Sequence, residues 1–180
     1  MKKILLQSVI IAAGLVSVCV SPGVCRQHPW QDSFVSHLQG TAYGRAAGGE
    51  EFGLLERNMP LEEGDALLAG PDGFMELTLF GGIRIWLNTD SLISIDRLYR
   101  RPRFALATGE IFFSNPDTTS DNTRVIIATP AARVCLTTGS LVQLSLAEDG
   151  ELSVAVWEGS ADIQGDNAVC SVSAGRRVTV

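Results

Sequence analysis

Few residue types in this chain are placed for chemistry. The two histidines, His28 and His37, precede the regularly patterned part of the sequence, where surface linker residues are the simpler interpretation. No serine lies in a Gly-x-Ser-x-Gly pattern, and no segment has the glycine spacing of a nucleotide-binding loop. Cysteine and histidine spacings typical of zinc or haem ligands are also absent. The sequence therefore predicts no catalytic residues, no metal site and no cofactor.

Acidic residues are the only abundant residue type here that could act in catalysis. Two carboxylates can act as the acid and base of a glycosidase from any two places in a chain. Asp65 and Asp72, however, lie in turn sequences that explain them without catalysis. A non-catalytic protein is the favoured interpretation, and a small carbohydrate-active enzyme on a β scaffold is the alternative.

Two cysteines, Cys135 and Cys170, would certainly remain after removal of an N-terminal leader. In an oxidising compartment they can form a disulfide, provided that their strands are neighbours with Cα atoms about 4.4–6.8 Å apart. Each also lies in an apolar segment, where a lone cysteine packs well as a small core residue. Both the disulfide and the free thiols are therefore open at this point.

The strongest candidate for a binding surface is basic. One run carries four arginines within seven residues: Arg97, Arg100, Arg101 and Arg103. A solvated loop between strands is the structural interpretation, and a docking patch for an anionic polymer or a partner protein is the functional one. Trp86, on the polar face of a nearby alternating segment, is the second candidate. The formal net charge of −6 gives no general attraction for nucleic acid.

The N-terminus resembles a targeting segment. Met1-Lys2-Lys3 precedes the uncharged and mostly apolar run 4–20, and Ser21-Pro22-Gly23 ends it, which is the layout of a secretory signal peptide. An uncleaved anchor is the alternative, because about 17 residues is near the lower limit for spanning a bilayer. Cleavage would leave twelve arginines against twenty acidic residues, a formal charge of −8. We expect an exported protein, in the periplasm or on the cell surface, or membrane-anchored if the segment is retained.

The remaining sequence predicts β-strands that position these side chains. Residues 74–87, FMELTLFGGIRIWL, contain two alternating runs around Gly81-Gly82, which is typical of a β-hairpin whose glycines supply positive φ. Its apolar face should pack in the core. Turn sequences recur about every ten residues from Gln39 onward, and Asp149-Gly150 joins a second hairpin.

These patterns predict three parts of the chain. Residues 1–25 are the signal peptide or anchor, residues 26–38 are a linker, and residues 39–180 are a single all-β domain. We expect this domain to be a two-layer, mainly antiparallel sandwich or flattened β-roll.

The order of the motifs resembles that of the FecR domain. The resemblance begins with LEEGDALLAGPDGFMELTLFGGIRIWLNTDSLISIDR and continues through ALATGEIFF, VIIATPAARVCL, LSVAVWEGSADI and VSAGRRVTV, over about residues 39–180. Two places depart from it. Residues 137–139 read Thr-Thr-Gly where the family commonly has Arg-Gly-Thr, and Gly81 replaces the usual Asp of the hairpin turn.

The resemblance implies a function in the cell envelope. Well-known FecR-domain proteins also carry a cytoplasmic helical segment that controls a sigma factor, whereas this chain is expected to begin with its targeting run. A sensing, binding or scaffold module for another envelope protein or a cell-wall polymer is therefore implied. The alternatives are the carbohydrate-active enzyme and a structural subunit that assembles through edge strands such as residues 176–180.

Overall fold

The computed structural model describes residues 33–117, 124–165 and 169–180. Regular structure within these ranges is β-strand, apart from a short 3₁₀ turn at Phe80–Gly82. No helix in this part of the chain is long and apolar enough to cross a membrane. The expected signal segment 1–25 and most of the expected linker lie outside the described residues. The prediction of an all-β fold is confirmed.

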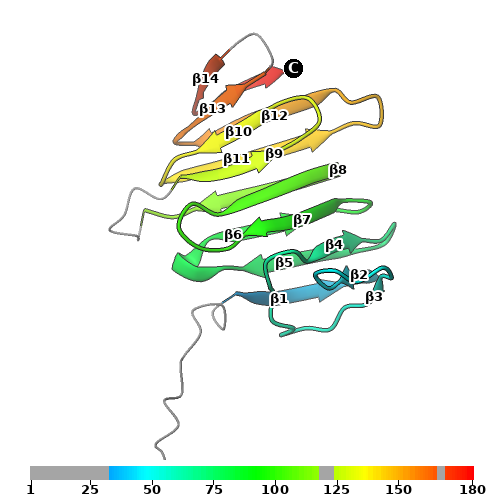
Figure 1. Ribbon diagram of the computed structural model, residues 1–180. Helices are drawn as coiled ribbons and strands as arrows, with labels where there is room; N and C mark the ends of the chain where they lie inside the picture. Colours follow the sequence, from blue (N-terminus) through cyan, green and yellow to red (C-terminus); the bar gives the residue numbers. More distant parts are fainter. Residues whose placement is uncertain (1–32, 118–123, 166–168) are drawn as a thin grey trace, which may run out of the picture.

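The strands form one open sheet that is folded over into two layers (Figure 1). In order of pairing, the A layer consists of β1 (Phe34–Gln39), β5 (Phe74–Thr78), β6 (Arg84–Leu87), the second half of β8 (Arg103–Asn115), β11 (Ser140–Leu146), β12 (Leu152–Glu158) and β15 (Arg176–Thr179). The B layer consists of β3 (Gly53–Leu54), β2 (Ala42–Arg45), β4 (Ala66–Ala69), β7 (Leu92–Arg97), the first half of β8, β9 (Val125–Ala128), β10 (Arg133–Leu136), β13 (Ser160–Gln164) and β14 (Val169–Ser173). Pairing between the described strands is antiparallel except between β8 and β9, so the predicted mainly antiparallel architecture is confirmed.

Strand β8 joins the two layers by bending back on itself. Phe104 in its first half and Phe113 in its second half have ring centroids only 6.4 Å apart. A straight strand would separate two residues nine positions apart by about 30 Å. The two halves therefore face each other, and the apolar faces of both layers enclose one hydrophobic core.

Gly109 makes this bend possible. Its φ is +89°, and a Cβ built on it would lie 2.4 Å from the Oγ of Ser91 and 2.5 Å from the Cα of Ser91. Buried Ser91 fixes Glu110, the residue after Gly109. The Ser91 Oγ donates to the Glu110 carbonyl at 2.9 Å and accepts from the Glu110 amide at 2.8 Å. A bulge just before the bend also shifts the buried positions of β8 from even to odd numbers, so both halves keep an apolar inner face.

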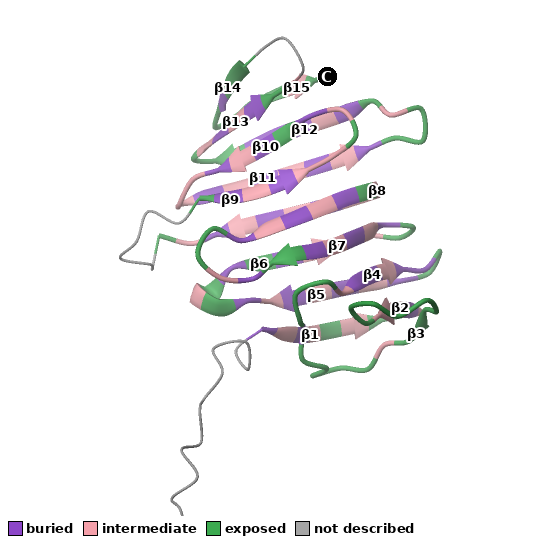
Figure 2. Cartoon of the chain, viewed as in Figure 1, coloured by how far each residue is buried: buried purple, intermediate pink, exposed green. Residues whose placement is uncertain are grey.

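The predicted hairpin at residues 74–87 is confirmed as core scaffold. Strands β5 and β6 pair in the expected register, and their inward side chains are buried, as Figure 2 shows for the layers as a whole: Met75, Leu77, Leu79, Ile83, Ile85 and Leu87. Both turn glycines have positive φ, as expected. The loop is longer than a two-residue turn, however, because Leu79 and Ile83 extend the ladder and Phe80–Gly82 closes it.

The predicted linker 26–38 is wrong at its C-terminal end, because Phe34–Gln39 forms strand β1. This strand pairs with β5, but its register shifts between Val35 and His37. The bulge breaks the period-2 alternation by which strands are found in a sequence. Only Val35 in this strand is fully buried, so the segment resembles a polar linker when only the sequence is considered.

Candidate binding surface

The outward side chains of the A layer form a continuous cross-strand row. Each position lies opposite the next in the strand register: Glu76, Trp86, Phe112, Gln143, Ala155 and Arg177. Glu110 lies two residues from Phe112 on the same face of β8. We call the surface made by Glu76, Trp86, Glu110, Phe112, Gln143 and Arg177 the outer A face. The period-2 pleat turns Glu76, Trp86, Phe112 and Gln143 outward, because both of their neighbours along the strand are buried, and the strand register places Glu110 and Arg177 on the same face.

Glu76 holds the indole of Trp86 in place. Its Oε2 accepts a hydrogen bond from Trp86 Nε1 at 2.8 Å, and its Oε1 accepts one from Ser36 Oγ at 3.1 Å. The Ser36 hydroxyl also lies 3.0 Å from the Glu76 carbonyl oxygen. These contacts link β1, β5 and β6 across the edge of the A layer, so Trp86 is a fixed, half-buried aromatic side chain rather than a freely rotating one.

Glu110 on β8, two strands from Glu76, is held in the same way. Its Oε2 accepts a hydrogen bond from Gln143 Nε2 at 2.7 Å, and its Oε1 accepts one from Asn88 Nδ2. A depression of about 270 Å³ lies beside this network, over β8, β11, β12 and β15. Its lining is mostly polar: Glu110, Gln143, Ser145, Ser153, Ala155 and Arg177. The outer A face therefore combines fixed hydrogen-bonding groups, one hollow and two aromatic rings.

The two carboxylates of this surface do not converge. Glu76 is turned towards Trp86 and Ser36, whereas Glu110 is turned towards Asn88 and Gln143. Strand β6 lies between them, and the strand spacing and register place their Cα atoms roughly 12 Å apart. Among the described residues, no group of three or more His, Cys, Asp or Glu side chains is arranged to hold a metal ion. The arrangement favours recognition of a surface by hydrogen bonds and aromatic contact.

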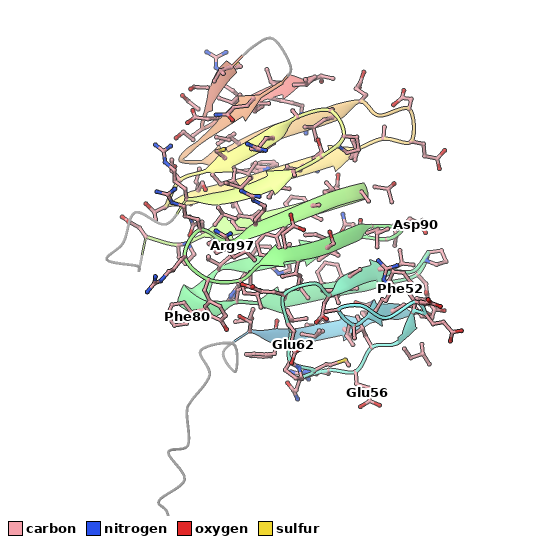
Figure 3. All side chains as sticks on the ribbon, viewed as in Figure 1. Phe52, Glu56, Glu62, Phe80, Asp90 and Arg97 are labelled. Atoms are coloured by element: carbon pink, nitrogen blue, oxygen red, sulfur yellow. The ribbon has the colours of Figure 1, made fainter. Side chains whose placement is uncertain are left out.

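The four arginines predicted as a docking patch lie elsewhere, in the hairpin between β7 and β8. Arg97 is paired with Arg103 across this hairpin, and Arg100 and Arg101 form its tip. We call these four residues the arginine hairpin; Figure 3 labels Arg97 on it. The hairpin belongs to the B layer, whereas Trp86 faces outward from the A layer. The structure therefore divides the candidate surface predicted from the sequence into two separate regions.

The possible disulfide between Cys135 and Cys170 is not formed, and both thiols are free. Cys135 lies on β10 and Cys170 on β14, with β13 paired between them. Two strand spacings amount to roughly 9–10 Å, beyond the span that a disulfide bridges. Cys135 is half-buried opposite outward Asp162, and burial raises the pKa of its thiol. The sequence shows that both cysteines lie in strands, but it does not show that a third strand separates them.

Comparison with known proteins agrees with the order of these elements. The family model described as "FecR protein" matches residues 65–162, from the end of the loop before β4 to within β13. The chain belongs to the FecR family. This match includes the bend at Gly109 and most strands of the outer A face.

Two crystal structures of a proposed anti-sigma factor from Parabacteroides distasonis ATCC 8503 share the fold of this FecR chain. Each is 16% identical to it with a TM-score of 0.55, over 64% of this chain and 54% of the other. At this identity the likeness shows the fold alone, and the matched region is about half of the anti-sigma chain. No curated protein matches the chain.

The FecR motifs have identifiable structural tasks here. Thr129 closes the β9–β10 turn, because its Oγ1 accepts from the Ala132 amide at 3.0 Å. Residues 137–139, which replace the common Arg-Gly-Thr, carry the chain from β10 in the B layer to β11 in the A layer. Gly139 has a φ of +72° there, and its amide donates to the Asn115 carbonyl at 2.6 Å. The departure from the family pattern therefore lies in the connection between the two layers.

Five residues of the outer A face were not identified as a site by the sequence motifs: Glu76, Glu110, Phe112, Gln143 and Arg177. The alternation of apolar and polar residues shows that most of them face outward. Which of them are neighbours depends on strand order and register, which the sequence does not show. The available clue was the motif that contains Gly109, Glu110 and Ile111, because a motif glycine marks a backbone conformation that other residues rarely adopt, and Glu110 follows it directly.

Proposed function

We propose that this FecR domain is a non-catalytic sensing or binding module of the cell envelope, and that it recognises a protein partner through the outer A face. The observation that carries the proposal is that both carboxylates and the indole of the outer A face are fixed before any partner binds. Fixed side chains lose little conformational entropy on binding, so a preorganised surface binds more tightly than a mobile one of equal area.

The composition of the outer A face suits a protein partner. Tryptophan, phenylalanine and arginine are enriched at protein interfaces, and Trp86, Phe112 and Arg177 occupy one row. Polar side chains surround them, as at the rim of a transient interface. The fold shared with a proposed anti-sigma factor supports a signalling role in which the domain contacts another protein. The targeting segment expected from the sequence supports a location in the envelope.

The enzyme alternative receives less support from the same residues. A glycosidase needs two carboxyl groups about 5–9.5 Å apart on either side of a substrate. Glu76 and Glu110 are turned to different partners and are both occupied by side-chain donors. A cell-wall polymer could also contact the aromatic rings, and the test below distinguishes it from a protein.

A matched pair of serines allows a direct test by crosslinking in the native envelope. Ser145→Arg fills the depression of the outer A face, whereas Ser94→Arg places the same side chain on the outward face of β7 in the B layer. We expect a protein crosslinked to the unmodified chain to be captured with Ser94→Arg and lost with Ser145→Arg. Equal capture by both variants would contradict the proposal for this face, and recovery of glycan without protein would favour a cell-wall polymer.

A further inference from the structure

The arginine hairpin carries charge that the rest of the described chain leaves uncompensated. Arg97, Arg100 and Arg101 are exposed, and none of the four guanidinium groups pairs with a carboxylate of another described residue. Arg124 lies beside them, because the Ile126 amide donates to the Pro102 carbonyl at 2.9 Å and Arg103 pairs with Ile126. A cluster of five arginines is therefore concentrated at one place in an acidic protein.

The acidic residues near this cluster are fewer than its arginines and form no ion pair with them among the described residues. Glu63 lies close by, but its Oε1 accepts a hydrogen bond from the Leu98 amide at 2.9 Å. Asp96 is exposed next to Arg97 in β7 and has no ion pair to another described residue. Glu62 lines the same depression as Glu63, Leu98 and Tyr99, and Asp162 in β13 accepts a hydrogen bond from Ser171 at 2.6 Å. Each of these carboxylates keeps its negative charge, so five arginines against four acidic residues leave a small local excess of positive charge, and the arginines have no ion pairs to other described residues.

An exposed aromatic ring lies next to the arginines. Phe80, at the tip of the β5–β6 hairpin, is 51% exposed, and its ring centroid is 6.0 Å from that of Tyr99 in the arginine hairpin. Figure 3 shows Phe80 and Arg97 on one side of the molecule and Asp90 on the opposite side. The tips of two hairpins, one from each layer, thus present an aromatic side chain among arginines. We call this surface, made by Phe80, Tyr99, Arg97, Arg100, Arg101, Arg103 and Arg124, the basic end.

The backbone at the basic end is strained in a way that stability alone does not explain. Arg100 and Arg101 have φ values of +47° and +78°, in the left-handed region that is unfavourable for a residue with a Cβ. Glycine or asparagine would occupy these two turn positions at lower cost. Strain of this kind is typically retained where the side chains are needed for function.

The chain enters the fold at the same end. Buried Ser33, the first described residue, accepts a hydrogen bond on its Oγ from the Phe80 amide at 3.2 Å. Only twelve residues, 21–32, separate the apolar run 4–20 from Ser33, and an extended chain of that length spans at most about 42 Å. A chain held in a membrane by that run would therefore allow the basic end to reach the bilayer surface.

We propose that the basic end docks the domain on an anionic lipid surface, with the arginines bound to headgroup phosphates and Phe80 in the interfacial region. Arginine forms paired hydrogen bonds with phosphate, and clustered basic residues are attracted to anionic leaflets. Tyrosine is enriched at membrane interfaces, and phenylalanine is typical of the buried side of interfacial segments. Docking of this kind leaves the outer A face directed sideways and accessible. The inference does not depend on the partner proposed for that face.

Arginine labelling of the full-length chain on vesicles tests the inference. The chain is mixed with vesicles of phosphatidylcholine alone or with a third of the lipid replaced by phosphatidylglycerol, treated with phenylglyoxal, and analysed by peptide mass spectrometry. We expect phosphatidylglycerol to reduce labelling of Arg100 and Arg101 at least fivefold. Arg45 and Arg133 in the same molecule serve as internal controls and should change less than twofold. Because the comparison is between lipids, insertion of the apolar run into both vesicles does not affect the result.

Two variants with the same change in charge complete the test. Arg100→Glu/Arg101→Glu should abolish the lipid-dependent protection of Arg97, Arg103 and Arg124, whereas Arg45→Glu/Arg133→Glu should preserve it. Equal labelling on both kinds of vesicle, or equal loss of protection in both variants, would overturn the inference. Protection by soluble polyglutamate as strong as that by phosphatidylglycerol would also overturn it, because the basic end would then recognise an acidic protein chain.

Discussion

The outer A face and the arginine hairpin differ in how many contacts their charged side chains make with the rest of the fold. On the outer A face, Glu76 and Glu110 each accept hydrogen bonds from two side chains on neighbouring strands. In the arginine hairpin, four cations lack ion pairs to other described residues, and two of them are in the left-handed region. Charges on the first surface should contribute to stability, whereas those on the second should not. Charged residues without such contacts can be replaced with little effect on the stability of the fold.

The largest effect is expected at Gly109, where β8 bends and where Glu110 of the outer A face is positioned. We expect Gly109→Ala to lower the free energy of unfolding by at least about 3 kcal/mol, because left-handed strain and a close contact with Ser91 act together. Urea-induced unfolding followed by circular dichroism measures the change. Gly150→Ala is the control, since Gly150 has a φ of +90° but no atom within 4 Å of its added Cβ, and it should cost only about 1 kcal/mol. Equal losses would show that the contact at Ser91 is unimportant.

The next effect tests whether a charge on the outer A face stabilises the fold. Glu110→Ala removes the acceptor of the Asn88 and Gln143 amides, and we expect a loss of about 2 kcal/mol in the free energy of unfolding. Glu148→Ala removes an exposed acid that bonds to no other described residue, and the loss should stay within about 0.5 kcal/mol. If the two variants lose the same stability by thermal or urea denaturation, the distinction between satisfied and unsatisfied charges does not hold.

A smaller effect is expected for Trp86, whose indole is fixed by Glu76. Trp86→Phe keeps an aromatic ring but removes the donor of the 2.8 Å hydrogen bond, so we expect a loss of about 1 kcal/mol. The matched control is Trp157→Phe, because Trp157 is 57% exposed and should be nearly neutral in the same unfolding experiment. A neutral Trp86→Phe would indicate that the ring is not held by Glu76.

The smallest effect should have the opposite sign, and it lies in the arginine hairpin. Arg101→Gly removes the strain of a side chain at a φ of +78°, but glycine also raises the entropy of the unfolded chain. We expect the first effect to be larger, so that the free energy of unfolding rises by about 0.5 kcal/mol. Arg101→Ala keeps the strained backbone and should give no gain. A loss of stability in Arg101→Gly would show that this arginine supports the fold, which would remove the contrast between the two regions.

Much of the scaffold could be predicted because its signals are local. Residues 74–87 alternate with period 2 on both sides of a glycine pair, and the structure confirms the pairing and the buried face. Strand β1 escaped prediction because a bulge beside Ser36 interrupts its alternation. The candidate surface was predicted only in part. Trp86 and the four arginines were identified by residue type, but they belong to different layers.

The sequence by itself determined the all-β class, the hairpins and the side of each strand that is buried, because these depend on residues a few positions apart. Its ordered motifs also indicated the FecR family. Only the tertiary structure decided that β8 bends back at Gly109, that β13 separates Cys135 from Cys170, and that Glu76, Trp86, Phe112, Gln143 and Arg177 lie side by side. Neighbours across a sheet are set by strand order and register, and these follow from how two apolar faces meet around one core.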